Sequence, residues 1–584
     1  MPKVKNSKFA FKAFLKSIKP FRFAILASIV LSIGSAVLGL FTPKLLGDMT
    51  NIAVSTYPNI DWGAIAGKIA LIISLFLGSA VLGYAQAYIL AIVTAKYTRG
   101  LRNQIIEKIS RLPISYFDKH KFGDTLSRMT NDVEVLDNSL SQEIADISLS
   151  LTTLVGIIVV MLTISVPLSL ISFVVIPLSV LVVGKIAGFA QKFFQEQQAT
   201  LGILNSKIEE NYAGDLILKA NSHEEAAKDD FKKTNDKLAT TAWKAQFFSS
   251  LSFPITHIFT NLGYVVTCIV GGYLVIDGHI SIGNMQAFIQ YVSRFNRPIT
   301  EVASTVSTLQ ALLAAAERIF EFLDEPEEEP DMVPAQTIST PRGAVEFHDV
   351  CFSYDKKNPI IEHFSASIKP GQQVAIVGPT GAGKTTVINL LMRFYDPDSG
   401  YITIDGIPTR EMKRADVRQL FGMVLQDTWL FSGSITDNLR YGKQDATKSD
   451  IERAAKNSDV HHVVESLSAG YDTLINEDSD NISAGEKQLL TIARAMVADP
   501  PMIILDEATS NVDTRTEQLV QAAFEKLTKG RTSFVIAHRL STIRNADLIL
   551  VMKDGNIIEQ GNHDELLKKR GFYAELYNSQ FTED

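Results

Sequence analysis

Residues 374–391 combine the features that a protein needs to hold a phosphate group. Their sequence, VAIVGPTGAGKTTVINLL, predicts an apolar strand, a glycine loop and a helix, in that order. Glycines let loop N–H groups point at phosphate oxygens, and the helix N-terminus adds a positive dipole end. Lys384 brings a positive charge to the β- and γ-phosphates of ATP, and Thr385 offers its hydroxyl to Mg²⁺. The predicted ATP-binding residues of this segment are Gly378, Pro379, Thr380, Gly381, Ala382, Gly383, Lys384, Thr385 and Thr386.

A second apolar run, MIILDEATS at residues 502–510, ends in two acidic residues. Asp506, at the predicted strand end, suits Mg²⁺ bound through a water molecule. Glu507 is placed to orient or deprotonate the water that attacks the phosphate. The alternative is an acidic pair on the surface after a strand, and the glycine loop in the same chain favours the catalytic role.

Three other residues follow predicted strands and fit the same chemistry. His538, in FVIAHRL, can reach a γ-phosphate with a ring nitrogen, and Gln426, in GMVLQDTWLF, can touch both metal and a neighbouring domain. Tyr354, in CFSY, can stack on a nucleotide base. Taken singly, the histidine and the tyrosine fit a structural role better than a functional one. From residue 345 onward, short β-rich runs alternate with helical ones, which predicts an α/β domain with a mostly parallel sheet.

The first 320 residues are much more apolar than the rest, in a chain of 584 residues with mean hydropathy +0.11. Six segments are long and apolar enough to span a membrane. They are residues 23–41, 69–95, 147–166, 168–184, 247–276 and 282–313. Arg294, Arg297 and Glu301 interrupt the last segment, so we expect them to face a water-filled interior. Alternatively, a bend at Pro298 places them near the membrane interface.

Two long connections, residues 96–146 and 185–246, are rich in Lys and Arg, and the other connections are short or poor in these residues. This asymmetry predicts that both termini and both long connections are cytosolic. Since helix breakers are few, we expect the spanning helices to continue about 30 Å beyond the membrane. Short transverse helices are expected between Pro113 and Gly123 and around Gly214, where each could dock on a soluble domain.

The N-terminal 22 residues contain six Lys and one Arg but no acidic residue. Phe11, Phe14, Leu15 and Ile18 have helical spacing, which predicts an amphipathic helix on the membrane surface, with a disordered basic tail as the alternative. We found no secretory signal. The net charge of −8 gives no general argument for nucleic-acid binding, and two distant cysteines form neither a disulfide framework nor a zinc motif.

These patterns divide the chain into four parts. Residues 1–22 form a cytosolic amphipathic elbow, and residues 23–322 form an all-α transmembrane domain of six helices with long cytosolic extensions. Residues 323–343 form a linker rich in acids and prolines, and residues 344–584 form an α/β P-loop nucleotide-binding domain.

Over essentially its whole length, the chain resembles the bacterial half-size ATP-binding-cassette (ABC) exporters of the multidrug type. The resemblance rests on Tyr354, on the glycine loop, on Gln426, on Asp506 and Glu507, on Asp513 and on His538. It also rests on the segment that stands where the family has the signature L-S-G-G-Q, which here reads Ile482, Ser483, Ala484, Gly485 and Glu486. YFDKHKFGDTLSRMTNDVEVL and AAAERIFEFLDEPEE carry it in the membrane half. The resemblance implies a dimer in the plasma membrane that sandwiches two ATP molecules, each between one subunit's glycine loop and the other's signature serine.

The signature departs from the family pattern at Ala484 and Glu486. The alanine restricts the backbone, and the glutamate brings negative charge toward a triphosphate, so binding or hydrolysis should weaken there. In a heterodimer, the altered signature would affect only the site built on the partner's glycine loop. We therefore favour a heterodimer with a second half-transporter, and SNVD in place of the commoner SALD supports this choice. The alternative is a homodimer that tolerates the change.

The predicted function is ATP-driven export of hydrophobic or amphipathic compounds by alternating access, with ATP and Mg²⁺ as cofactors. Lipid or peptide export on the same fold, and an ATP-binding membrane switch or channel, are the alternatives. Five polar residues of the predicted spans are expected to line the substrate cavity: Gln86, His257, Asn261, Arg294 and Glu301.

Overall fold

The computed structural model describes residues 6–355, 358–426, 428–475, 482–506, 514–536 and 540–581. Within these ranges, side chains are not described at 175–177, 179–180, 296, 303–304, 306–307, 514, 540–542 and 579–581. The chain forms two compact units. The first contains Met1–Ser110 and Phe122–Glu325, and the second contains Arg111–Lys121 and Pro326–Asp584.

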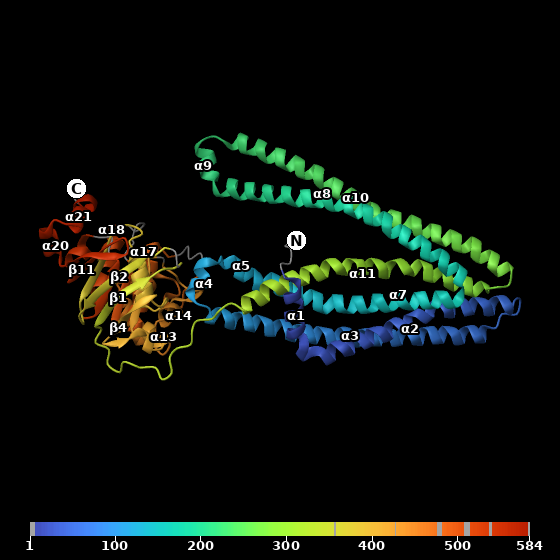
Figure 1. The fold of residues 1–584 in the computed structure, drawn as a ribbon, viewed down its shortest axis with the longest axis horizontal. Coiled ribbons are helices and arrows are strands. Elements are labelled where there is room, and N and C mark those ends of the chain that lie inside the picture. Colours follow the sequence, from blue (N-terminus) through green and yellow to red (C-terminus); the bar gives the residue numbers. More distant parts are fainter. Residues whose placement is uncertain are drawn as a thin grey trace. The chain divides into compact units, whose positions relative to one another are not determined.

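The first unit is helical throughout the residues described (Figure 1). Its elements are α1 (Ser7–Ile18), η1 (Lys19–Phe21), α2 (Arg22–Ser55), α3 (Trp62–Arg111), α5 (Phe122–Ser127), η2 (Arg128–Asp132), α6 (Val133–Asn138), η3 (Ser139–Glu143), α7 (Ile144–Ile164), α8 (Val166–Ala213), α9 (Asp215–Ala220), α10 (Glu224–Ile276) and α11 (Ile282–Leu323). The segment from α5 to α7 is continuous, with π-helical turns at η2 and η3.

Long apolar helices occupy all six segments predicted to cross a membrane. In the described part of the chain, four helical segments meet the length and hydropathy required for a span: Ser7–Ser55, Trp62–Arg111, Phe122–Ile164 and Glu224–Ile276. The other two predicted spans lie in α8 and α11, of which some side chains are not described. The third span ends at Ile164, two residues earlier than predicted, because Ser165 is extended and the next helix starts at Val166, with Pro167 in its first turn.

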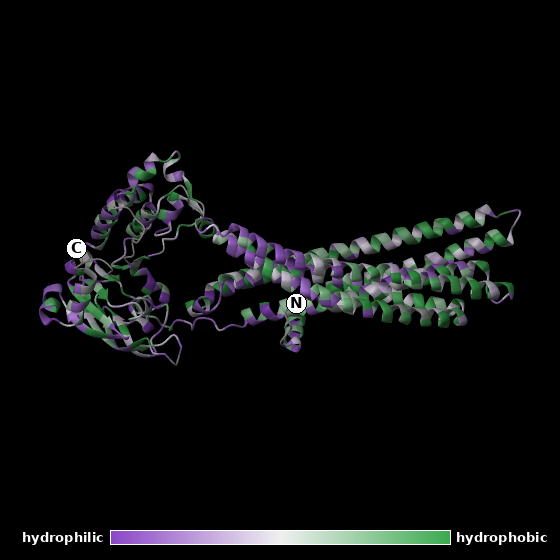
Figure 2. Cartoon of the chain, turned by 90° about the horizontal axis from the view of Figure 1, so that it is seen from above, coloured by the Kyte–Doolittle hydropathy of each residue, from purple (hydrophilic) through white to green (hydrophobic). Residues whose placement is uncertain are grey.

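The predicted extensions of the spanning helices are present. Helices α8 and α10 pack along each other and diverge from the other long helices toward α9, the short helix that joins them (Figure 1). Hydrophobic residues dominate the long helices on the side away from α9 (Figure 2). Short helices occur at both predicted transverse positions, namely α9 and, in the second unit, α4 (Ile114–Lys119).

Close contact between glycines lets α2 and α11 approach each other. A methyl group added at Gly47 would lie 2.2 Å from the carbonyl oxygen of Gly283, and one added at Gly283 would lie 1.8 Å from that of Gly47. The side chain of Asn51 accepts a hydrogen bond of 2.8 Å from the backbone N–H of Gly283. Small residues at such crossings allow the close backbone packing that stabilises helix pairs in lipid.

The second unit is an α/β domain with two main sheets. Its strands are β1 (Val345–Phe352), β2 (Ile361–Ile368), β3 (Gln373–Val377), β4 (Ser399–Ile404), β5 (Ile407–Pro408), β6 (Phe421–Val424), β7 (Gly433–Ser434), β8 (Leu474–Ile475), β9 (Met502–Asp506), β10 (Thr532–Ile536), β11 (Leu548–Lys553) and β12 (Asn556–Gly561). The helices that follow α4 are α12 (Lys384–Leu391), η4 (Thr409–Glu411), α13 (Arg414–Gln419), α14 (Ile435–Arg440), α15 (Lys448–Asn457), α16 (His461–Ser466), η5 (Gly470–Asp472), α17 (Ala484–Ala498), α18 (Thr514–Thr528), α19 (Leu540–Asn545), α20 (His563–Lys569) and α21 (Phe572–Phe581).

The larger sheet has the strand order β12-β11-β3-β10-β9-β6, and all its strands except β12 are parallel. The smaller sheet, β2-β1-β4-β5, is antiparallel. The sequence did not distinguish this second sheet, although β2 alternates between buried and exposed residues, which is typical of a strand with one covered face.

The acidic linker is bound to the second unit by buried arginines. Arg414, whose side chain is 11% exposed, pairs with Asp331 of the linker at 3.0 Å and with Asp396 at 3.1 Å. Arg393, which is 6% exposed, pairs with Asp396 at 3.0 Å. Because each buried guanidinium has carboxylate partners, the linker follows the surface of the unit on a defined path.

Replacement of Gly47 by alanine is expected to destabilise the helical unit, because the added methyl group meets rigid backbone of α11. The cost should be about 1–3 kcal/mol, as for other overpacked sites. Thermal unfolding of the detergent-solubilised protein should show a transition several degrees lower. The control is Gly67→Ala in exposed α3, where the added methyl meets nothing within 4 Å. Equal melting temperatures for the two variants would contradict the close contact.

Candidate nucleotide-binding site

The topology of the larger sheet gathers the predicted nucleotide-binding residues at one edge. Strands β3, β10, β9 and β6 are neighbours and parallel, so their carboxyl ends face the same way. The glycine loop follows β3, Asp506 ends β9 opposite Ile536 of β10, and Gln426 lies two residues beyond β6. Ligands of open α/β sheets bind at this kind of edge.

The loop between β3 and α12 has a backbone that only glycine adopts easily. Gly381 and Gly383 have φ angles of +85° and +97°, in the left-handed region. At Gly378, a side chain would meet the carbonyl oxygen of Met552 at 2.3 Å. These glycines allow the chain to turn tightly from the strand into α12.

Lys384, the first residue of α12, lies over this loop. Its Nζ donates hydrogen bonds to the carbonyl oxygens of Gly378 at 2.8 Å and Pro379 at 3.1 Å. Burial lowers the pKa of the Lys384 amine, and the nearby carboxylate of Asp506 acts in the opposite direction. Lys384 and Asp506 therefore interact electrostatically. This proximity fits a site in which the lysine binds phosphate and the aspartate binds the metal ion beside it.

The oxygen atoms in this region suit a magnesium ion. Thr385 is exposed at the start of α12, Asp506 is half-buried at the end of β9, and Gln426 is exposed beyond β6. A hydroxyl, a carboxylate and an amide oxygen are the hard ligands that Mg²⁺ prefers beside phosphates. The donor set therefore fits the ion.

Tyr354 lies beside the first turn of α12. Its hydroxyl donates a hydrogen bond to Thr386 Oγ1 at 3.3 Å and accepts one from Asn389 at 3.1 Å. The ring packs edge to face against Phe352 and Tyr395, each with a centroid distance of 5.0 Å, and its side chain is 39% exposed. The ring is therefore fixed next to the loop while remaining accessible to a base.

Tyr395, which we did not identify from the sequence, joins this aromatic cluster to α4. Its hydroxyl donates a hydrogen bond to the carboxylate of Asp118. Burial raises the pKa of the Tyr395 hydroxyl, and the charge of Asp118 raises it further, so the group remains a proton donor. The two residues are 277 positions apart, and no sequence spacing signals their contact.

The residues of the altered signature begin helix α17. Ser483 is the N-cap, and its hydroxyl accepts a hydrogen bond from the backbone N–H of Glu486 at 3.4 Å. The carboxylate of Glu486 accepts one from the backbone N–H of Ser483 at 2.8 Å, which completes a capping box. Ala484 starts the helix and Gly485 is buried within it. The negative charge of Glu486 is thus held at the same helix end as the Ser483 hydroxyl.

Arg494 connects the signature helix with the segment that follows Gln426. Its guanidinium donates hydrogen bonds to the carbonyl oxygens of Asn438 at 2.9 Å and Trp429 at 3.0 Å. It also lies 5.7 Å from the ring centroids of Phe431 and Tyr441. Burial lowers the pKa of this guanidinium. Arg494 was not predicted from the sequence, because its contacts are made with backbone carbonyls distant in the chain.

Three predicted residues, Glu507, Asp513 and His538, lie outside the described residues. Their flanking strands are defined, because Asp506 and Ile536 pair across β9 and β10. The roles of Glu507, Asp513 and His538 remain predictions.

A cavity of about 560 Å³ lies among α2, α3, α7 and α11 of the first unit. Its polar lining includes Ser79, Asp146, Ser150, Arg294, Arg297 and Glu301. Glu301 accepts hydrogen bonds from Arg297 at 2.8 Å and from Ser150. The interrupting charges of α11 therefore face a cavity, as expected. The other predicted lining residues, Gln86, His257 and Asn261, do not line this cavity. His257 and Asn261 belong to α10, which diverges from the bundle (Figure 1).

Two family models match the chain. The model described as "ABC transporter transmembrane region" matches residues 25–299, and the one described as "ABC transporter" matches residues 361–510. The chain therefore belongs to the ABC transporter family, and it is an ATP-hydrolysing membrane transporter. Because it carries one transmembrane region and one nucleotide-binding domain, it is a half-size transporter and works as a dimer.

Relatives along nearly the full length carry different substrate names. The chain is 42% identical to a "Fatty acid ABC transporter ATP-binding/permease protein" of Mycobacterium bovis, over 96% of this chain and 95% of the relative. It is 35% identical to an "ATP-dependent lipid A-core flippase" of Syntrophus aciditrophicus, over 88% and 85% of the two chains. It is 33% identical to the "Putative multidrug export ATP-binding/permease protein YgaD" of Bacillus subtilis, over 97% and 99%.

Removal of the Tyr395 hydroxyl should weaken the link between the nucleotide site and α4. Tyr395→Phe keeps the ring that packs on Tyr354, so ATP affinity should stay within about twofold. Loss of one hydrogen bond to a charged group, about 1.5–3 kcal/mol, should lower ATP-driven transport of an amphipathic dye at least fivefold in proteoliposomes.

The matched control is Tyr401→Phe on β4, whose ring is 48% exposed and stacks on His348. Asp118→Asn keeps an oxygen acceptor and should retain most transport. If Tyr395→Phe transports at the rate of the control, the Tyr395–Asp118 contact has no coupling role.

Proposed function

We propose that this protein exports hydrophobic or amphipathic compounds across the plasma membrane, using ATP in an alternating-access cycle. The observation that carries this proposal is the cavity of α2, α3, α7 and α11, which places charged and hydroxyl side chains among apolar spans. Charges within spanning segments are costly and usually mark a transport pathway. We also propose that six helices span the membrane and that both termini lie in the cytosol.

In the proposed cycle, the glycine loop and Lys384 bind the β- and γ-phosphates, and Tyr354 stacks on the base. A bound Mg²⁺ would neutralise phosphate charge, held by Thr385, Gln426 and Asp506. Glu507 orients or deprotonates the attacking water, and His538 contacts the γ-phosphate. Asp513 meets the partner at the subunit interface. ATP shifts the transporter because it binds the closed dimer more tightly than the open one.

Two exposed apolar surfaces support docking of a partner chain. At the α9 end of the helical unit, Tyr212, Leu216 and Ile217 are 87%, 81% and 68% exposed. In the second unit, Trp429 and Tyr441 are 61% and 65% exposed. Exposed apolar groups of this size are typical of interaction sites. In a dimer, each surface would bury its apolar side chains against the partner chain.

The capping box favours a heterodimer. Glu486 holds a carboxylate at the helix end where the partner's ATP would place its γ-phosphate, so this signature suits a site that binds ATP without rapid turnover. The glycine loop, Asp506 and Glu507 of this chain would instead meet the signature of a second half-transporter and hydrolyse ATP there.

The central cavity favours amphipathic substrates. It combines acidic and basic side chains, and within the described residues Arg297 has an ion-pair partner in Glu301 whereas Arg294 has none. An unpaired guanidinium beside apolar helices suits a compound with an apolar body and an acidic head. The relative named as a fatty acid transporter supports this class of substrate. More broadly, we propose that the chain exports several amphipathic compounds, as a multidrug exporter does.

Glu507→Gln tests the export cycle. The amide keeps the shape of the side chain but cannot accept a proton, so ATP binding should persist and hydrolysis should fall by at least about a hundredfold. The measurements are ATP affinity, phosphate release and dye accumulation in inside-out vesicles. ATP hydrolysis at the rate of the unaltered protein would remove Glu507 from the proposed role, and hydrolysis without accumulation of any amphiphile would contradict export.

Reconstitution tests the heterodimer. Purified alone in liposomes, the chain should hydrolyse ATP and transport poorly, because both sites would carry the altered signature. Ala484→Gly combined with Glu486→Gln should raise its turnover several-fold, since the glutamine can still cap α17 but carries no charge. Robust transport by the unaltered chain alone would overturn the heterodimer.

A further inference from the structure

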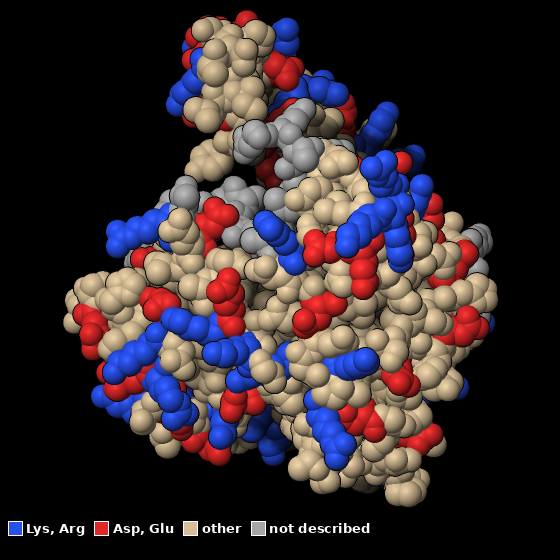
Figure 3. Space-filling view, turned by 90° about the vertical axis from the view of Figure 1, so that its left-hand side faces the viewer, with Lys and Arg blue, Asp and Glu red and all other residues tan. Residues whose placement is uncertain are grey.

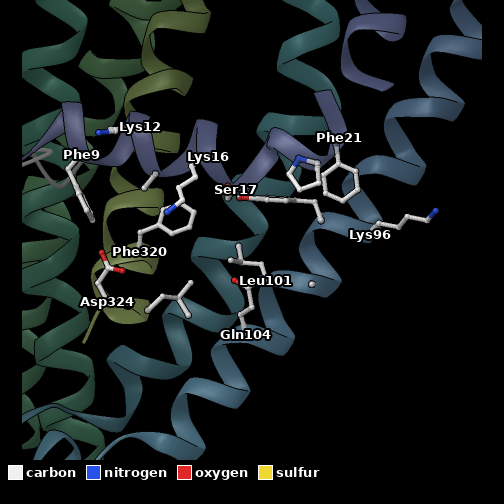
Figure 4. A pocket seen from close by; sticks show the side chains of 15 residues that line it. Phe9, Lys12, Lys16, Ser17, Phe21, Lys96, Leu101, Gln104, Phe320 and Asp324 are labelled. Carbon is white, nitrogen blue, oxygen red and sulfur yellow. Dashed lines mark hydrogen bonds between the residues drawn. The ribbon is translucent and has the colours of Figure 1, made fainter. Parts of the chain in front are cut away.

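A second cavity, of about 730 Å³, lies between the N-terminal helix α1, η1 and the helices α3 and α11 (Figure 4). It shares no lining residue with the central cavity of α2, α3, α7 and α11. Helix α1 runs across the long helices instead of along them (Figures 1 and 4). This direction is the one expected of an amphipathic helix that lies in the plane of a membrane surface.

The walls of this cavity are apolar and aromatic, and its charged side chains are mostly basic. Phe9 and Phe21 stand at opposite ends in Figure 4, with Leu101 and Phe320 between the helices. The charged lining residues are Lys12, Lys16, Lys96 and Asp324. Lys16 extends from α1 into the cavity, whereas Asp324 lies at the end near Phe9 and Lys96 at the end near Phe21 (Figure 4).

Specific contacts keep the cavity open under α1. Ala10 and Phe14 are buried, and the ring of Phe14 packs edge to face on Tyr97. The hydroxyl of Ser17 hydrogen-bonds that of Tyr97 at 2.9 Å, and the backbone N–H of Asn6 donates to Glu317 at 2.5 Å. Helix α1 is therefore attached to α3 and α11 at several points along its length, and the cavity is part of a defined structure.

We propose that this cavity binds an anionic phospholipid of the cytosolic leaflet. The lysines would neutralise the phosphate and the aromatic walls would cover the first part of an acyl chain. The lining contains three lysines and one aspartate, so its charge is positive, and Lys16 is the lysine that extends into the cavity (Figure 4). The carboxylate of Asp324 repels the head group from the end of the cavity near Phe9. Lys96 directly follows the predicted span 69–95, so the amines lie at the depth of lipid head groups.

The experiment measures binding of a short-chain phosphatidylglycerol to the delipidated full-length protein in detergent, purified with its partner subunit if one is present. Lys12→Gln with Lys16→Gln should weaken binding at least about tenfold, since each basic residue at an anionic surface contributes appreciably. Lys8→Gln with Lys19→Gln is the matched control, because it removes the same charge from the same region but from residues that do not line the cavity. That pair should stay within about twofold.

A second variant fills the cavity and leaves every charge in place. Gly100 lines the cavity, and a Cβ added there meets nothing within 4 Å, so Gly100→Leu should fold and exclude the acyl chain. It should weaken binding about as much as the double lysine variant. Gly202→Leu on α8, where an added Cβ also meets nothing within 4 Å, should have no effect.

Two comparison probes separate the lipid from other ligands. Short-chain phosphatidylcholine should bind at least about tenfold more weakly, and millimolar inorganic phosphate should not displace phosphatidylglycerol. Equal binding of the two lipids, displacement by phosphate, or equal losses in both lysine pairs would each overturn the proposal. None of these results depends on ATP turnover, so the test stands apart from that of the export cycle.

Discussion

A triphosphate carries a high density of negative charge, and the second unit offers a suitable place for it at the carboxyl edge of its parallel strands. There the glycine loop presents backbone N–H groups, Lys384 supplies a cation, and Asp506 stands at the neighbouring strand end. In the proposed cycle, the bound phosphate is the source of free energy for closure of the dimer and for movement of the spanning helices.

Transport requires that this edge be connected to elements far from it, and the second unit contains two such connections. On one side, Tyr354 contacts Tyr395, whose hydroxyl binds Asp118 of α4. On the other, Arg494 joins the signature helix to the carbonyl of Trp429, three residues after Gln426. Both connections use buried or half-buried polar groups. The Tyr395 hydroxyl binds the carboxylate of Asp118, and the Arg494 guanidinium binds the carbonyl oxygens of Trp429 and Asn438.

The helical unit balances apolar surface against charge. Its long helices are apolar where a membrane would surround them (Figure 2). Charged side chains occur in the cavity near Glu301, around α1 and along α8 and α10, where Lys207 pairs with Asp230. The face of the protein in Figure 3 shows Lys and Arg interspersed with Asp and Glu, in keeping with a net charge of −8 and no single basic field. The charges that matter for binding are therefore local, and their effect depends on the apolar walls around them.

The sequence by itself predicted the long apolar helices, the main strands of the larger sheet and the glycine loop, because these depend on local spacing. The six apolar segments, the transverse helices and the strand before Lys384 were predicted from residues close together in the chain. Only the tertiary structure decided which strands are neighbours, that a separate antiparallel sheet exists, and that Gln86 does not reach the central cavity. Whereas the capping box of Ser483 and Glu486 follows the S-x-x-E spacing already present in the sequence, the tertiary structure also revealed Tyr395–Asp118 and the cavity under α1. These features join residues through side-chain packing or backbone carbonyls, and such contacts leave no periodic signal in the sequence.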